Sequence, residues 1–136
     1  MGVKTRKLGN ISDQLVQWQA VHTADASNPL AVVAGRGYFI NTTSAVQTVT
    51  LPGSPVIGDT IMIVDYASTF NTNNVTLDPG SNKIEGSTDD GILTTNDQTH
   101  TLVFTDSTQG WKIVNQDTAA GIQPAYNTAT GGTVTT

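Results

Sequence analysis

The chain lacks cysteine and is poor in charge. It has 136 residues, none of them cysteine, so it can form neither a disulfide nor a thiolate metal site, and it has no thiol nucleophile. Charged residues make up 12% of the chain, about half the share that is usual in soluble proteins. No apolar run approaches the roughly 18 residues that a membrane-spanning helix needs. These absences exclude thiol chemistry, and we expect no membrane partner.

Threonine and asparagine take the place of the missing charge. The branched Cβ of threonine suits the pleated surface of a strand, and asparagine favours turns. The longest patterned stretch, YFINTTSAVQTVTLPGSPVIGDTIMIVDYASTF from Tyr38 to Phe70, alternates strands and turns of this kind. The composition and this stretch both predict an all-β protein.

Residues 37–115 are the predicted body. Residues 46–51 alternate apolar and threonine side chains, as in a half-buried strand, whereas the run at 61–64 is apolar on both faces, as in a strand covered twice. We expect strands at residues 38–41, 46–51, 61–64, 75–77, 101–105 and 111–114, with a short one near Ile84. Short strands separated by turn signals predict a small β-sandwich or jelly-roll-like domain.

Residues 1–22 form a predicted attachment arm. Its start holds three basic residues: Lys4, Arg6 and Lys7. A basic arm of this kind binds nucleic acid or an acidic protein surface, and the acidic remainder of the chain argues against a nucleic-acid-binding protein. We therefore expect the arm to dock onto protein, with Leu15 and Trp18 as its buried anchors. Its secondary structure has two open interpretations, an amphipathic helix and an extended strand.

Two further segments flank the body. Residues 23–36 are predicted to be a loop that leads into it, because Asn28-Pro29 and two glycines interrupt any regular pattern. Residues 116–136 are small, polar and glycine-rich, as in a linker or a flexible tail. Their last part, TGGTVTT, is typical of the start of another strand, which would follow in a longer product or pair with a neighbouring chain.

The sequence gives little support to catalysis. The histidines, His22 and His100, are far apart, no G-x-S-x-G motif is present, and we expect His100 to be a surface residue of a strand. Asp59, Asp65 and Asp106 stand at turns, where an aspartate accepts backbone N–H bonds. We predict no catalytic residue, no cofactor and no enzyme activity.

Two loops resemble calcium sites weakly, because calcium takes oxygen ligands from loops. Residues 77–86 contain three oxygen donors: Asp78, Asn82 and Glu85. Gly80 stands where an EF-hand loop has its second ligand, so the pattern is incomplete. STDDG at 87–91 is a second weak candidate. Plain turns are the preferred interpretation of both, and we predict no metal.

Three side chains of the body are candidates for contact with another molecule. Trp111 and Tyr38 would form a platform for a sugar if exposed, whereas buried aromatic rings fill a core or a subunit contact. We predict that both lie in a subunit contact. Arg36, the one arginine of the body, either reaches a partner's carboxylate or is solvated.

An ordered series of short motifs runs along the body: YFINTT, TVTLP, GDTIMIVD, NNVTL, KIEG and LVFTDSTQGW. Together they span about residues 37–114. This ordered set resembles a β module that recurs in virion proteins of tailed bacteriophages, notably fibre proteins of phages that infect marine bacteria and cyanobacteria. The segment TATGGTVTT resembles the linker that leads to a further glycine-rich β domain in such proteins.

The resemblance implies a non-enzymatic structural part of a phage particle. Such proteins are usually homotrimers, and their N-terminal segment docks to other virion proteins. We therefore expect a fibre, or the particle-anchoring N-terminal part of one, attached through residues 1–22. One alternative in the same particle is a capsid decoration or cement protein. Another, of a different class, is a module that binds host glycans through Trp111 or Tyr38.

Overall fold

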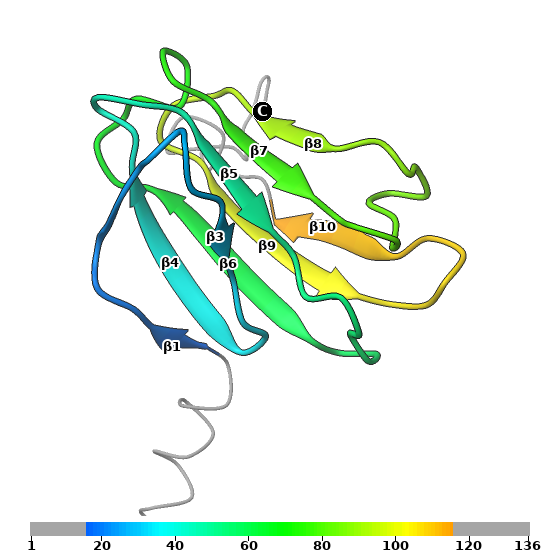
Figure 1. The fold of residues 1–136 in the computed structure, drawn as a ribbon. Helices are drawn as coiled ribbons and strands as arrows, with labels where there is room; N and C mark the ends of the chain where they lie inside the picture. Colours follow the sequence, from blue (N-terminus) through cyan, green and yellow to red (C-terminus); the bar gives the residue numbers. More distant parts are fainter. Residues whose placement is uncertain (1–15, 116–136) are drawn as a thin grey trace, which may run out of the picture.

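The computed structural model describes residues 16–115, which form two β-sheets that face each other across one core (Figure 1). Sheet A contains β1 (Gln17–Trp18), β2 (His22–Thr23), β4 (Arg36–Asn41), β6 (Thr60–Asp65), β9 (Thr99–Phe104) and β10 (Trp111–Asn115). Sheet B contains β3 (Leu30–Ala31), β5 (Gln47–Thr50), β7 (Val75–Asp78) and β8 (Gly91–Leu93). The described residues contain no helix, and hence none that could cross a membrane. The all-β prediction is confirmed.

From β2 to β7, successive strands alternate between the two sheets. From β1 to β7 the chain crosses from sheet A to sheet B and back, and each strand lies parallel to a strand of the previous pass: β4 to β1 and β2, β5 to β3, β6 to β4, and β7 to β5. The last strands pair antiparallel, with β8 on β7, β9 on β6, and β10 on β9. The small two-sheet domain is therefore present, but it has a parallel pairing that the strand pattern alone does not predict.

The core follows the two-residue alternation of the strands. On β6, which lies between β4 and β9, Ile61 and Ile63 are fully buried while their neighbours on the strand are only partly buried. The rings of Phe104 and Trp111 meet edge to face, with 5.4 Å between their centroids. Full burial of one such side chain contributes roughly 1.5–3 kcal/mol, so this core is the main source of stability.

The sheets begin earlier in the chain than the predicted body. β1 lies along the edge of β4, where the Gln17 N–H donates to the Gly35 carbonyl at 2.7 Å and the Gln19 N–H to the Gly37 carbonyl at 2.9 Å. The described part of the arm therefore forms strands, as in the extended interpretation. The other predicted arm residues, Lys4, Arg6, Lys7 and Leu15, and the tail at 116–136 lie outside the described residues.

Three aspartates hold turns in place, as predicted. Asp59 accepts a bond from the Val56 N–H at 3.0 Å, and Asp106 accepts bonds from two N–H groups of its own turn. The buried Asp65 accepts three, from Thr69, Phe70 and Asp97, and so ties two loops together. The carboxylates of these three residues serve the fold.

Candidate docking surfaces

The outer face of sheet A, which points away from sheet B, carries an exposed tryptophan. A Cβ added to Gly37 would lie 2.5 Å from two ring carbons of Trp18, so the indole lies flat on the backbone of β4. The same ring stacks on Phe39, with 4.8 Å between centroids and 26° between planes. Trp18 remains 48% exposed. Glycine at position 37 thus allows a flat indole on the sheet, with one face turned outward.

The apolar surface continues from Trp18 across the next strands. Met62 pairs with Gly37 across the sheet and Val64 pairs with Phe39, and both side chains are partly buried. We call Trp18, Phe39, Met62 and Val64 the Trp18 patch. None of its side chains is charged, so nothing in the patch opposes burial against an apolar partner. It is a sheet face suited to contact with another protein.

The chain enters and leaves sheet A at opposite edges. β1 lies on one side of β4, and β10 is the last strand on the far side, beyond β6 and β9 (Figure 1). β10 is antiparallel to β9, which is antiparallel to β6, whereas β1 and β6 both run parallel to β4. β1 and β10 therefore point the same way.

The predicted subunit contacts, Tyr38 and Trp111, both lie inside the core. Trp111 has no exposed surface, and Tyr38 is buried with its hydroxyl accepting a bond from the Val33 N–H at 2.8 Å. Neither ring offers a surface to a sugar or to another subunit in this structure. The exposed aromatic ring of sheet A is instead Trp18, which stacks on the partly buried Phe39 and lies over Gly37.

The structure contradicts the prediction for His100. We expected a surface residue, but its side chain is only 4% exposed and lies on the inner face of β9. Both ring nitrogens lack a hydrogen-bond partner. Burial lowers the pKa of His100 below its usual 6.5, because the interior disfavours the charged imidazolium. The reason is the alternation of the strand, which places His100 on the same side as Leu102 and Phe104.

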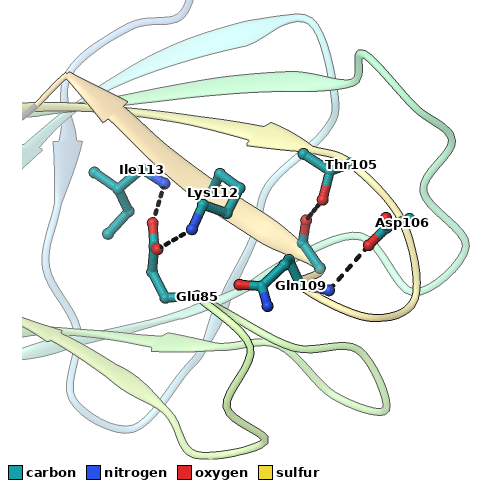
Figure 2. A network of polar contacts seen from close by, with 7 residues as sticks. Glu85, Thr105, Asp106, Gln109, Lys112 and Ile113 are labelled. Carbon is teal, nitrogen blue, oxygen red and sulfur yellow. Dashed lines mark hydrogen bonds and ion pairs between the residues drawn. The ribbon is translucent and has the colours of Figure 1, made fainter.

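The loop at residues 77–86, for which a plain turn is preferred over a calcium site, closes a sheet edge. Glu85 accepts bonds from the Lys112 ammonium at 2.5 Å and the Ile113 N–H at 2.7 Å (Figure 2). The hydrogen bond from Lys112 is the largest cause that lowers the pKa of Glu85, and the bond from the Ile113 N–H is the second largest. The Trp111 N–H donates to the Lys83 carbonyl at 2.7 Å. The loop therefore occupies backbone groups of β10 that would otherwise be free to pair with another strand.

The residues 16–115 hold no recognisable catalytic constellation. His22 is bonded to Gln47, at 2.9 Å between Nε2 and Oε1, rather than to a serine or a carboxylate. Within the same range no group of three or more histidine, aspartate or glutamate side chains is arranged to hold a metal ion. The exposed apolar surface of sheet A is therefore the candidate functional feature of the described residues.

Comparisons with known proteins leave the family open. No protein-family model matches the chain, and no curated protein matches it. Among solved structures, one similar chain belongs to "Structure of a chaperone-substrate complex", with 13% identity and a TM-score of 0.42 over 72% of this chain and 17% of that chain. A likeness at this level carries no argument about function.

Proposed function

We propose that the chain is a non-enzymatic structural protein of a tailed-phage particle, most simply a fibre or the part of a fibre that anchors it to the particle. The observation that carries the proposal is the arrangement of the two chain exits. β1 and β10 lie at opposite edges of sheet A and point the same way, so the body connects a segment on one side to a segment on the other. This arrangement suits a module that links a particle to an outward-reaching part.

The Trp18 patch supports the docking role of the N-terminal side. Trp18 belongs to the predicted arm, and its indole forms the most exposed part of an uncharged sheet face. Exposed aromatic side chains on a well-packed surface are frequent energetic centres of protein interfaces. The basic residues Lys4, Arg6 and Lys7 would steer the arm toward an acidic surface. We expect the partners to be other virion proteins, and the assembled form to be a homotrimer.

The test is incorporation of shortened chains into the particle. Removing residues 1–15 leaves every described strand in place, because β1 begins at Gln17, so this variant keeps its body. We expect it to be almost absent from purified particles, while a chain without residues 121–136 is incorporated normally. Normal incorporation of the chain without residues 1–15 would contradict the proposal.

The position of the protein on the particle separates a fibre from a decoration protein. Gold-labelled antibodies against residues 16–115 would mark the tail or its base for a fibre, and the head surface for a decoration protein. The glycan-binding alternative has lost its proposed platform, since Tyr38 and Trp111 are both buried.

A further inference from the structure

The end of the sandwich at which β1, β4 and β6 begin carries exposed aliphatic side chains. The Gln17 N–H donates to the Gly35 carbonyl and the Gly35 N–H to the Thr60 carbonyl, both at 2.7 Å, so the starts of the three strands lie side by side. We call this the proximal end. It includes the connection between β5 and β6, at the lower right of Figure 1. The chain before Val16 also joins the body here.

The connection contains a tight turn of four residues, Val56–Asp59, and three of them form it. The Asp59 N–H donates to the Val56 carbonyl at 3.0 Å, and Gly58 has a φ of 92°. This combination defines a type II turn, in which the third position needs a positive φ and favours glycine. Asp59 also accepts a bond from the Val56 N–H at 3.0 Å. The remaining residue, Ile57, contributes no bond to the turn.

The turn is fixed to sheet A. The Gly58 N–H donates to the Phe104 carbonyl and the Phe104 N–H to the Asp59 carbonyl, both at 2.9 Å. These bonds extend the pairing of β6 with β9 into the turn. The turn would therefore lose little conformational entropy when a partner binds its tip.

The tip of this turn carries exposed aliphatic side chains that the turn itself does not require. Ile57 is 81% exposed and Val56 is 63% exposed, and Val33 at the same end is also exposed. The second position of a type II turn tolerates most residues and favours proline, so the fold does not require isoleucine there. Single exposed aliphatic residues are common. Two adjacent ones on a fixed turn, beside the segment proposed to dock, form a small preorganised apolar surface.

We propose that the turn Val56–Asp59 is a second docking element, whose Ile57 side chain enters an apolar pocket on the same virion protein that receives the N-terminal arm. The inference rests on the proposed function. The 15 residues before Val16 start from the proximal end and contain Lys4, Arg6 and Lys7. The partner surface would thus combine acidic groups for the arm with an apolar pocket for the turn. One partner would then bind both the arm and the fixed turn.

The experiment measures binding of the purified chain to particles assembled without it. The variant Ile57→Ser removes an exposed side chain and leaves the turn bonds intact, and it should weaken binding about tenfold or more, as truncation of an interface anchor does. The matched control is Ile92→Ser, because Ile92 is also exposed, at 60%, but lies on β8 of sheet B. The control should bind within about twofold of the unchanged chain.

A second variant tests the geometry of the turn. Gly58→Ala keeps the Ile57 side chain but strains the positive φ that the turn needs. Weaker binding by this variant, with thermal unfolding close to that of the unchanged chain, would support a role for the fixed turn. Full binding by both Ile57→Ser and Gly58→Ala would overturn the inference.

The outcomes separate this inference from the proposed function. If removal of residues 1–15 abolishes binding while Ile57→Ser binds as well as Ile92→Ser, the arm docks alone and the inference is wrong. If removal of residues 1–15 leaves binding unchanged, the proposed docking function fails, whatever the turn variants do. Loss in both the shortened chain and Ile57→Ser, with Ile92→Ser unaffected, supports a two-part docking end.

Discussion

The two outer faces of the sandwich are built from the same kind of strand but differ in chemistry. On sheet B, Thr48 pairs with Thr76, and Thr76 in turn pairs with Ile92 at the edge. On sheet A the corresponding outward positions carry the Trp18 patch, with threonines at Thr60 on β6 and on β9. Threonine satisfies the strand and also faces water well. The outer face of sheet A is therefore the more apolar of the two, and it is the candidate contact surface.

The largest expected effect comes from Gly37→Val, which breaks the surface of sheet A. Its Cβ would fall 2.5 Å from the Trp18 ring, so the indole must leave the sheet. We expect a loss of about 2 kcal/mol in the free energy of unfolding, measured by urea denaturation. The control is Gly53→Val, because a Cβ at Gly53 meets nothing within 4 Å. Equal stability of the two variants would show that Trp18 does not depend on Gly37.

The second largest effect is a pH dependence of stability, and it arises on the inner faces of the two sheets. Sheet A buries His100, whereas sheet B buries Gln47 and apolar side chains. Because the pKa of His100 is lowered from 6.5 in the folded chain, the unfolded chain binds a proton first as the pH falls. The contribution of His100 to the free energy of unfolding is fully present above its pKa in the unfolded chain. As the pH falls below that value, this contribution is lost by about 1.4 kcal/mol for each pH unit, until the pKa of His100 in the folded chain is reached.

Urea denaturation between pH 7.5 and pH 5 measures this loss. The variants His100→Phe and His100→Gln cannot take up the proton, so their stability should vary less with pH over this range. Asp25 and Glu85 also have lowered pKa values, but their usual values of 3.8 and 4.5 place their titration below this pH range. The same pH dependence in the unchanged chain and in both variants would contradict the assignment to His100.

The smallest effect is expected on the outer face of sheet B. Thr76→Val removes a hydroxyl from a partly buried outward position and keeps a branched Cβ, so the free energy of unfolding should change by less than about 0.5 kcal/mol. Thermal unfolding by circular dichroism is a sufficient measurement. A loss above 1 kcal/mol would mean that the threonine face of sheet B has a packing role and is not merely solvated.

Much of the fold is readable from the local pattern of the sequence. The strands around Val49 and Leu102 lie where apolar alternation predicts them, and the turn at 106–110 joins β9 to β10 as expected. The strand at 61–64 lies where its apolar run predicts it, but Met62 and Val64 on its second face are only partly buried. The turn aspartates also follow from their positions. These features depend only on neighbouring residues, which is why a single sequence is enough to predict them.

The remaining features depend on residues distant in sequence. Parallel pairing of β4 with β6 requires the chain to cross through sheet B between them, and no local pattern records that path. The burial of Trp111 depends on both sheets closing over it. For His100 a signal was present, because alternation with Leu102 places it inside. For the Trp18 patch the signal was Gly37, a glycine within a strand, which often marks close approach of another group.

The loop that carries Glu85 has a consequence for crowding. Proteins displayed in many copies at close quarters risk joining through the free edges of their sheets, since an unpaired strand is a template for another chain. On the β10 side this chain occupies its own edge, and Gly110 permits the contact, because a Cβ there would lie 2.0 Å from the Lys83 carbonyl oxygen. A methyl group at position 110 would therefore push the loop away from β10 and leave backbone groups of that strand open to pairing with another chain.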